Sequence, residues 1–206
     1  MSRGRLITVE GIDGAGKTTL VTALERELAG RGRPVTVLRE PGGVELSERI
    51  RALVKDPSLH VEPRAEALLY AAARAQLTAE ALLPRLAAGE WLLLDRFVDS
   101  SLAYQGGGRA LGVPEVAAIN DFATGGLKPD RTLLLRIDSA AGLARAGGRG
   151  EEADRLEREA GAFFAATAAV YDALAAAEPE RFAVLDATLG PDRVLADALS
   201  ALAPLL

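Results

Sequence analysis

Five short apolar runs along the chain predict the strands of a sheet. Each run is rich in leucine or β-branched residues and ends at polar or turn-forming residues, which is typical of a buried strand. The runs span residues 5–9, 34–38, 91–94, 132–137 and 182–185.

Apolar residues elsewhere recur at helical spacing. Leu20, Leu24 and Leu28, for example, share one face of a helix predicted over 17–29. We expect Pro84 to kink or break a long helix and the glycines at 106–108 to end another. The remaining predicted helices cover residues 45–55, 63–88, 97–104, 114–123, 139–146, 152–178 and 191–203.

Strands that alternate with helices predict an α/β fold, in which a parallel sheet carries helices on both faces. Such sheets are joined by right-handed crossovers and bind ligands at the carboxyl ends of their strands. Unusual polar or glycine-rich sequences follow residues 9, 38 and 94, at three predicted strand ends. We therefore expect one shared site at this edge of the sheet.

Composition narrows the classes of protein that the chain can represent. Its 206 residues suit one domain over 1–206, and its 49% hydrophobic and 26% charged residues exclude a disordered chain. The net charge of −5 argues against a general nucleic-acid binder. The chain has no cysteine and one histidine, His60, which excludes disulfides, thiolate catalysis and histidine-rich metal sites.

The hydrophobic runs are too short for a membrane-spanning helix or a signal peptide. We therefore expect a cytoplasmic protein without a membrane partner.

Residues 11–18, GIDGAGKT, match the phosphate-binding pattern G-x-x-x-x-G-K-[ST] between a predicted strand and a predicted helix. In such a loop backbone N–H groups and the helix N-terminus face a phosphate, the lysine approaches the β- and γ-phosphates, and the hydroxyl suits Mg²⁺. The alternative is a glycine-rich turn with an incidental lysine. The chain holds 21 arginines and only 3 lysines, and the compact ammonium of Lys17 suits a phosphate-wrapping loop better than a guanidinium does. We expect ATP to be bound by Gly11, Ile12, Asp13, Gly14, Ala15, Gly16, Lys17, Thr18 and Thr19.

Binding of ATP leaves the reaction open. The base-reading N-K-x-D motif of GTPases is absent from the sequence, and a second anion-binding region suggests phosphoryl transfer to a small acceptor. A module that binds ATP only as a switch is the alternative from another class.

Further segments match one family in the family's own order. They are EGIDGAGKTT at 10–19, REPGG at 39–43, LLYAAARAQL at 68–77, DRFVDSSLAYQGGGR at 95–109 and, more loosely, RGEEADRLE at 149–157. On these segments the chain resembles the bacterial thymidylate kinases.

The resemblance implies a P-loop nucleoside monophosphate kinase fold: a three-layer sandwich of the P-loop NTPase type with a five-stranded parallel sheet and a small lid near 143–156. It also implies transfer of the ATP γ-phosphoryl group to dTMP, giving dTDP for dTTP synthesis, with Mg²⁺, in a homodimer. A cis peptide bond is expected at Glu40-Pro41. A kinase of another nucleoside monophosphate, with a related pocket, is the nearest alternative.

Several acceptor-phosphate contacts follow from the resemblance. Asp95, at a strand end, suits Mg²⁺-bound water together with Thr18. Arg96 would contact the acceptor phosphate and bridge it to the γ-phosphate, and Arg51 would be its second arginine, beside Glu40. The alternative for Asp95-Arg96 is a surface ion pair that caps a helix. From spacing alone, Arg51 is more typical of a solvated helix face, and only the match to REPGG reverses this.

The base contacts begin with Tyr70 and Arg74, which share a helix face. By resemblance Tyr70 stacks on thymine and Arg74 donates to the base oxygen O4. The alternative is an aromatic residue at a helix–core boundary with a snorkelling arginine.

The DRF segment would complete the acceptor pocket. By resemblance Ser101 and Gln105 bond to the base, beside Ser100, while Tyr104 packs where a ribose 2′-hydroxyl would sit and so selects deoxyribose. Asp13 would lie near the sugar 3′-hydroxyl. A polar helix end before a glycine run is the alternative.

The predicted lid supplies the last positive charge. No variable position of the phosphate loop is basic, so we expect Arg149 to approach the transferred phosphoryl group after a hinge at Gly147-Gly148, and Arg145 to lie over adenine. A solvated helix rich in ion pairs is the alternative. The residues expected to act in catalysis are Lys17, Arg96, Arg149 and Asp13.

Overall fold

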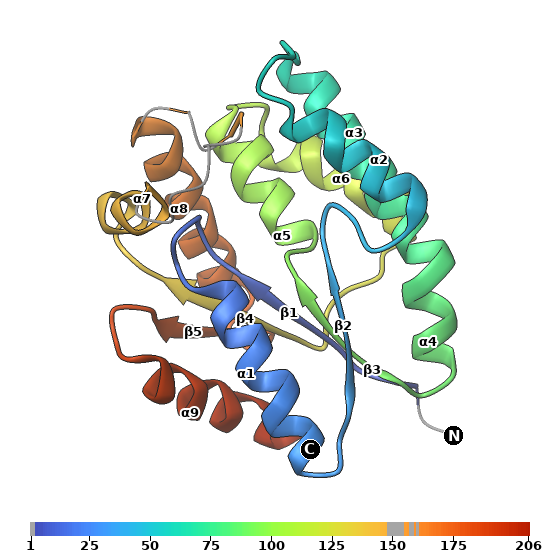
Figure 1. Ribbon diagram of the computed structural model, residues 1–206. Helices are drawn as coiled ribbons and strands as arrows, with labels where there is room; N and C mark the ends of the chain where they lie inside the picture. Colours follow the sequence, from blue (N-terminus) through green and yellow to red (C-terminus); the bar gives the residue numbers. More distant parts are fainter. Residues whose placement is uncertain (1–2, 148–154, 157–158, 160) are drawn as a thin grey trace.

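The computed structural model describes residues 3–147, 155–156, 159 and 161–206 (Figure 1). Within these residues, five strands form one parallel sheet in the order β2-β3-β1-β4-β5. The expected α/β fold with a five-stranded parallel sheet is therefore confirmed. The strands are β1 (Leu6–Glu10), β2 (Val35–Arg39), β3 (Trp91–Asp95), β4 (Arg131–Arg136) and β5 (Phe182–Asp186).

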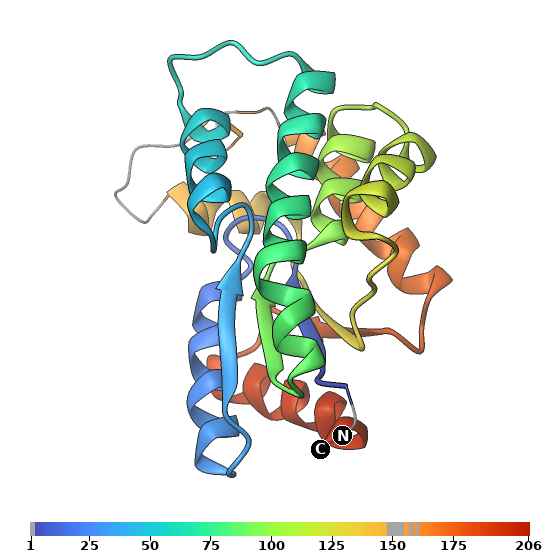
Figure 2. The ribbon, with the colours of Figure 1, turned by 90° about the vertical axis from the view of Figure 1, so that its right-hand side faces the viewer.

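Helices connect these strands and cover both faces of the sheet. Figure 2 shows α1 on one side of the strands and α3 and α4 on the other. The α-helices are α1 (Lys17–Gly30), α2 (Glu45–Lys55), α3 (Pro63–Leu77), α4 (Leu83–Ala87), α5 (Val98–Ser101), α6 (Val113–Thr124), α7 (Ser139–Gly147), α8 (Gly161–Ala177) and α9 (Pro191–Leu202). Two π-helical segments, η1 (Thr78–Leu82) and η2 (Leu102–Gly108), and a 3₁₀ turn, η3 (Ala203–Leu205), complete the described elements.

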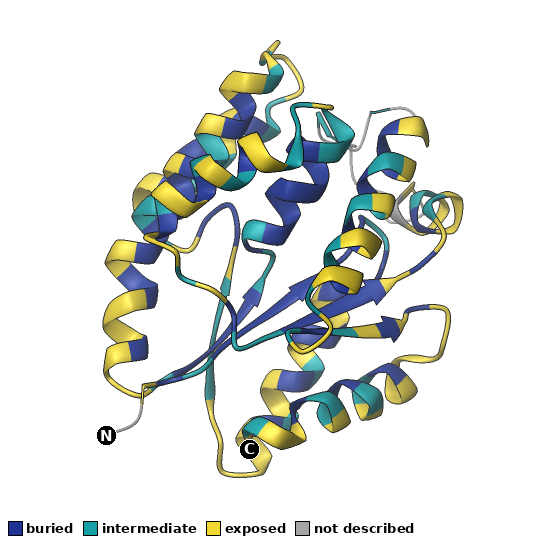
Figure 3. Ribbon diagram, turned by 180° about the vertical axis from the view of Figure 1, so that it is seen from behind, coloured by how far each residue is buried: buried dark blue, intermediate teal, exposed yellow. Residues whose placement is uncertain are grey.

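The core follows from the alternation of side chains along the strands. Leu6 of β1 lies beside Leu92 of β3, and both pack with Leu82 of η1 on one face of the sheet. Val9 packs with Leu24 of α1 on the opposite face. Burial is most complete in the central strands, as Figure 3 shows, and it fixes the carboxyl ends of β1 and β3 side by side.

The long helix around Pro84 does not break, although a kink or a break was expected there. Helical structure runs without interruption from Pro63 to Ala87, but its hydrogen bonding changes to the π type over Thr78–Leu82, just before the proline. Proline lacks an N–H group and its ring clashes with the carbonyl four residues earlier. A wider turn at this point accommodates the ring without ending the helix.

The glycines at 106–108 do end their helix, as predicted, but they belong to its last turn, so the helix reaches Gly108 rather than residue 104. They form the end of η2, where a β-carbon on Gly107 would lie 2.5 Å from a methyl carbon of Val170 and one on Gly108 would lie 2.6 Å from the ring of Phe163. Their lack of a side chain therefore lets η2 approach α8 closely.

The helix predicted over 152–178 was also placed too early. Arg155 and Leu156 form a turn, and the described helix α8 begins at Gly161. Among the described helices, none combines the length and apolar character needed to cross a bilayer.

Candidate active site

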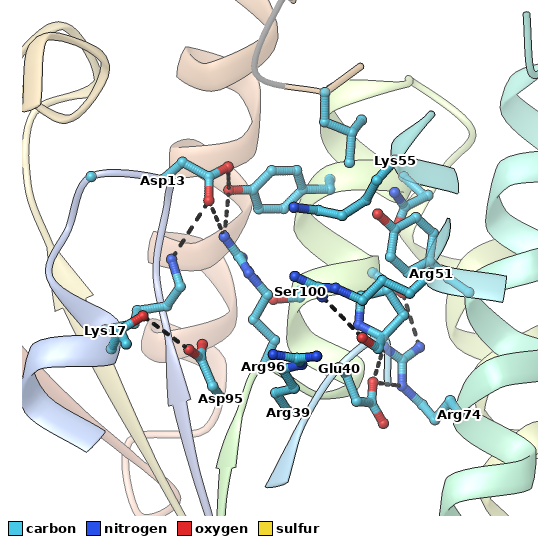
Figure 4. Close-up of a pocket in the computed structure, with 18 of the residues that line it drawn as sticks. Asp13, Lys17, Arg39, Glu40, Arg51, Lys55, Arg74, Asp95, Arg96 and Ser100 are labelled. Atoms are coloured by element: carbon cyan, nitrogen blue, oxygen red, sulfur yellow. Dashed lines mark hydrogen bonds and ion pairs between the residues drawn. The ribbon is translucent and has the colours of Figure 1, made fainter. Parts of the chain in front are cut away.

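A cavity of about 440 Å³ opens at the carboxyl ends of β1, β2 and β3 (Figure 4). The segments that follow these three strands all contribute to its lining, so they meet at one cavity, as expected. One end of the cavity, the P-loop end, contains residues of the loop 11–18. The other end, the α3 end, contains Tyr70 and Arg74 of α3 and Gln105 of η2. Arg96 lies between Lys17 and Arg74 in Figure 4.

The cavity is strongly basic, although the chain carries a net charge of −5. Three acidic side chains from the described residues line it: Asp13, Glu40 and Asp95. The basic side chains that line it are Lys17, Arg39, Arg51, Lys55, Arg74, Arg96 and Arg145. Such a concentration of positive charge suits ligands with several negative charges, and phosphates above all.

At the P-loop end, the backbone is prepared for an anion. Gly16 lies at the start of α1 in the left-handed region, with φ +96°, and no side chain caps the first N–H groups of the helix. Lys17 donates to the carbonyl oxygens of Gly11 and Ile12, at 3.1 and 2.9 Å. Burial and the nearby charge of Arg96 lower the pKa of Lys17 to about 8. Lys17 Nζ also lies 3.8 Å from Asp13 Oδ1, and a bound phosphate would add further negative charge beside the buried ammonium.

The side chains of Arg96, Asp13 and Tyr104 form one network. Arg96 Nη2 lies 2.5 Å from Asp13 Oδ1, and Tyr104 donates to Asp13 Oδ2 at 2.9 Å. Burial works to raise the pKa of Asp13, but the charges of Arg96 and Lys17 outweigh it and hold that pKa below its ordinary range. The guanidinium of Arg96 also lies 4.9 Å from the centre of the Tyr104 ring. Asp13 is therefore an ionised hydrogen-bond acceptor at neutral pH.

The backbone of Arg96 is in the left-handed region, with φ +72°. This conformation is uncommon for a residue with a side chain and persists only where the surroundings enforce it. Here the N–H of Arg96 donates to the carbonyl of Val9 at 3.1 Å. The turn directs the Arg96 side chain across the end of β1, toward the P-loop carbonyl of Gly11, 3.2 Å away.

Behind Arg96 lies a buried carboxylate that the sequence reasoning missed. Glu10 is fully buried and accepts from the N–H of Phe97, from Ser100 Oγ and from the Tyr171 hydroxyl, at 2.7, 2.6 and 2.9 Å. Burial, and secondly the charge of Asp99, raises the pKa of Glu10 to about 7. Ser100 Oγ also accepts from Arg96 at 3.1 Å, so Ser100 links Glu10 to the arginine.

At the α3 end, Arg74 is only 1% exposed and is surrounded by protein acceptors. Its Nε donates to Glu40 Oε2 at 2.7 Å, and its Nη2 donates to the carbonyl of Phe97 at 3.0 Å. Its Nη1 donates to Ser101 Oγ, at 2.9 Å, and to Asn120 Oδ1. No sequence pattern pointed to Asn120, which lies 46 residues further along the chain, on α6.

Glu40 sits in the turn 39–43, beside the cis peptide bond to Pro41 that the resemblance implied and that is confirmed here. One oxygen, Oε2, is bonded to Arg74, while Oε1 is buried and has no hydrogen-bond partner among the described residues. Burial raises the pKa of Glu40. An unpartnered buried oxygen that lines a cavity can accept a bond from a ligand.

Asp95 and Thr18 meet at the edge of the P-loop end. Thr18 Oγ1 lies 3.5 Å from Asp95 Oδ2, and Asp95 Oδ1 is buried with no partner among the described residues. Among the described residues, no group of three or more His, Cys, Asp or Glu side chains is placed to hold a metal ion. One hydroxyl and one carboxylate nevertheless fit Mg²⁺, which keeps several waters and takes substrate phosphates as ligands.

Comparison with known proteins decides the family. A family model described as thymidylate kinase matches residues 9–198. A thymidylate kinase of Deinococcus radiodurans is 50% identical to the chain, covering 98% of the chain and 97% of that protein. Thymidylate kinases of Halalkalibacterium halodurans and Halorhodospira halophila are each 45% identical, covering 97% and 99% of the chain and 96% of each relative. The chain belongs to the thymidylate kinase family.

In this member of the thymidylate kinase family, most of the site residues expected from the sequence line the cavity. Gly11, Ile12 and Ala15 are exceptions, because none of them lines the cavity. The side chains of Ile12 and Ala15 are buried in the core beside α1, so only their backbones remain for a ligand. The expected residues that line the cavity are Asp13, Gly14, Gly16, Lys17, Thr18, Thr19, Glu40, Arg51, Tyr70, Arg74, Asp95, Arg96, Ser100, Ser101, Tyr104, Gln105 and Arg145.

Half of the predicted lid, residues 148–154 with Gly148 and Arg149, lies outside the described residues. Arg145 lines the cavity and donates to the carbonyl of Ala187 at 2.8 Å. Arg155 ion-pairs with Glu66 Oε2 at 2.6 Å.

Two basic side chains that line the cavity, Arg39 and Lys55, were not among the site residues expected from the sequence. Arg39, at the end of β2, pairs with Glu48 at 3.2 Å, and Lys55 lies at the end of α2. Their signal was present in the sequence: Arg39 opens the REPGG segment, and Lys55 is one of three lysines in an arginine-rich chain. Arg51 of α2 lies beside them and donates to the carbonyl of Pro41 at 2.9 Å.

Proposed function

We propose that the protein transfers the γ-phosphoryl group of ATP to dTMP, giving dTDP on the route to dTTP. Membership of the thymidylate kinase family supports this reaction. The observation that carries it is one continuous basic cavity, which runs from the P-loop to the α3 end and so can hold two phosphorylated ligands with their phosphates adjacent.

ATP would occupy the P-loop end. The backbone of Gly11, Ile12, Gly14, Ala15 and Gly16 would wrap its phosphates, and the free N–H groups at the start of α1 would donate to them. Lys17 would then exchange its two loop carbonyls for the β- and γ-phosphates, beside Thr19. Arg145, next to the carbonyl of Ala187, would lie over adenine.

Thr18 and Asp95 would hold Mg²⁺, Asp95 through a bound water. When bound, the ion supplies positive charge to the β- and γ-phosphate oxygens. The protein's part is to hold these two side chains at the end of β3 and the start of α1.

The acceptor phosphate would lie between Arg96 and Arg51, with Arg96 bridging it to the γ-phosphate. Asp13 would accept from the sugar 3′-hydroxyl, since its pKa is held low. Tyr104, packed against Asp13 and Arg96, would fill the space that a ribose 2′-hydroxyl needs. The pocket would thereby select deoxyribose.

The base would occupy the α3 end. Tyr70 is half-buried, packs against the small apolar cluster of Ile50, Val54 and Ala73, and lines the cavity, so stacking on thymine is compatible with its position. Donation from Arg74 to O4 remains a proposal that requires an exchange of partners, because each nitrogen of its guanidinium already contacts protein. Ser101 and Gln105 would complete the pocket, beside Glu40 and Ser100.

The chemistry needs no strong base. The attacking oxygen of the acceptor phosphate is already anionic, and phosphoryl transfer has a loose transition state in which positioning and charge neutralisation carry most of the catalysis. Lys17 and Arg96 would supply positive charge from the described residues. Arg149 would add a third charge from a lid that closes over ATP and excludes water.

We extend the proposal to a homodimer in the cytoplasm, built from a single domain with a lid. Phe122 of α6 is 92% exposed and Leu68 of α3 is 56% exposed, on helices that pack against each other. Large exposed apolar side chains suit burial against a second copy. Sedimentation equilibrium should give twice the chain mass of 21.5 kDa, and a monomer at micromolar concentration would contradict the dimer.

An ADP-release assay with a panel of acceptors tests the reaction. We expect turnover with dTMP to exceed that with dUMP, dCMP and the nucleoside thymidine. A higher rate with another monophosphate would support the alternative kinase. Binding of ATP without acceptor-dependent release of ADP would support an ATP-sensing module.

A further inference from the structure

A fully buried carboxylate lies behind the α3 end of the cavity. Glu66, on the first turn of α3, is 0% exposed and does not line the cavity. Gln105 Nε2 donates to Glu66 Oε1 at 2.8 Å. Arg109 spans both carboxylate oxygens, with Nε 3.3 Å from Oε1 and Nη2 3.1 Å from Oε2. Arg155 Nη2 lies 2.6 Å from Oε2.

These contacts fix the orientation of the Glu66 carboxylate and leave it able only to accept hydrogen bonds. Two guanidinium groups hold the carboxylate in place, and the bidentate contact of Arg109 fixes its plane. A carboxylate in two ion pairs offers acceptor atoms only. Any partner of Glu66 must therefore donate to it.

That requirement decides which way the Gln105 amide faces. An amide group carries a donor nitrogen on one side and an acceptor oxygen on the other. If the amide were turned over, Gln105 Oε1 would face the carboxylate oxygen and two acceptors would oppose each other. Glu66 thus holds Nε2 away from the ligand, and Oε1 remains as the polar atom that Gln105 can offer.

Gln105 is 2% exposed yet lines the cavity, and no described residue donates to its Oε1. The neighbouring Arg74 has protein partners at each of its nitrogens. The α3 end therefore presents a fixed acceptor at Gln105 rather than a group that can switch between donor and acceptor.

We propose that Glu66 is a positioning residue for base selection: by fixing the Gln105 amide with Oε1 toward the cavity, it favours a pyrimidine whose ring N3 carries a hydrogen. This inference rests on the proposed function, in which the α3 end holds the base. Thymine and uracil carry the N3–H donor, whereas the N3 of cytosine is an acceptor and would oppose Oε1. Glu66 rejects cytosine without touching it.

The Glu66→Gln variant tests the inference, because its amide can donate as well as accept and so allows the Gln105 amide to turn over. The measurement is kcat/KM for dTMP, dUMP and dCMP. We expect the preference for dTMP over dCMP to fall about tenfold or more, the size of one hydrogen-bond difference. The ratio of dTMP to dUMP should stay within about twofold, since Gln105 does not read the methyl group.

Glu159→Gln is the matched control. Glu159 pairs with Arg109, its Oε1 lying 2.5 Å from Nη1, and it makes no contact with Gln105. The same charge is removed next to the same arginine, so the preference for dTMP over dCMP should remain unchanged. An equal loss of preference in both variants would mean that the effect comes from a loosened Arg109 and would overturn the proposal.

Gln105→Met keeps the proposal testable if Glu66→Gln fails to fold, which thermal unfolding would reveal. Methionine has a similar shape without the acceptor and leaves Glu66 with both arginines. We expect the preference for dTMP over dCMP to narrow here too, and an unchanged preference would contradict the proposal. If the wild type does not phosphorylate dTMP, the proposed function fails; if it prefers dTMP and a folded Glu66→Gln keeps the full preference, only the role of Glu66 fails.

Discussion

At the P-loop end of the cavity Lys17 donates to two carbonyls of its own loop and lies 3.8 Å from Asp13 of that loop, whereas at the α3 end Arg74 is held by four other residues. Lys17 is buried with its pKa lowered to about 8, so it gains when a phosphate arrives. The guanidinium of Arg74 is already satisfied. The partners of Arg74 are Glu40, Phe97, Ser101 and Asn120.

This difference separates two ways of preparing a site. The P-loop end keeps incompletely satisfied charges that a substrate completes, which suits a reaction driven by charge neutralisation. The α3 end is built and satisfied in advance, which suits selection, because a ligand that mismatches fixed polar groups leaves them unpaired. Substitutions at the P-loop end should therefore lower turnover, and substitutions at the α3 end should alter acceptor choice.

The largest effect is expected for Lys17→Ala. Removing the ammonium from the phosphate-binding loop should abolish phosphoryl transfer, a loss of about 10³-fold or more in kcat. The fold should survive, because Lys17 bonds only to its own loop. The measurement is ADP release beside thermal unfolding, with Lys128→Ala as the control lysine, which is 70% exposed. Loss of cooperative unfolding in Lys17→Ala would make the residue structural instead.

Arg149→Ala should also lower kcat, by roughly 10³–10⁵-fold where such a delivered arginine acts. The affinity for dTMP should change little, because Arg149 is assigned to the ATP phosphates. Steady-state kinetics with both substrates varied separates the two parameters. A kcat near that of the wild type would shift the role to another basic residue.

Arg74→Ala should weaken apparent transition-state binding of dTMP by about 2–4 kcal/mol, the range for a charged partner lost from a closed site. ATP binding should barely change, since the P-loop end makes no contact with Arg74. Arg64→Ala, an exposed arginine on the same helix, is the matched control. An unaltered kcat/KM for dTMP would refute the assignment of the α3 end.

Glu10 gives the smallest effect, on the pH dependence of stability. Its pKa is raised from 4.5 to about 7 in the folded protein, so between these values the folded state binds more protons than the unfolded state. The free energy of unfolding should therefore fall as pH rises from 4.5 to 7, by at most about 3 kcal/mol from this group. Glu10→Gln should remove that part of the slope, and denaturant titrations at several pH values measure it. Parallel curves for both proteins would show that Glu10 is not protonated.

The sequence predicted the fold and the P-loop end well, for a physical reason. Strand periodicity and the loop GIDGAGKT are local, so a continuous stretch of chain contains all the information. The α3 end depends on contacts between distant segments, such as Arg74 with Asn120 and Glu66 with Gln105. Such pairs leave no spacing to recognise, and only packing brings them together.

Two details of the helices could not be predicted from local preference. The glycines at 106–108 were expected to follow the helix that they end, yet Gly107 and Gly108 lie inside η2, where α8 approaches closely. Pro84 was expected to kink or break its helix, but helical structure continues past it after a π turn. At the glycines, tertiary packing outweighs local propensity.

The most direct test of the account follows the phosphoryl group itself. The wild-type protein is incubated with dTMP and ATP labelled at the γ-phosphate, and the products are separated. The account predicts that the label appears in dTDP in step with the ADP formed, and that little inorganic phosphate is labelled. Label in inorganic phosphate alone, or ADP formed without dTDP, would contradict a cavity that places the two phosphates side by side.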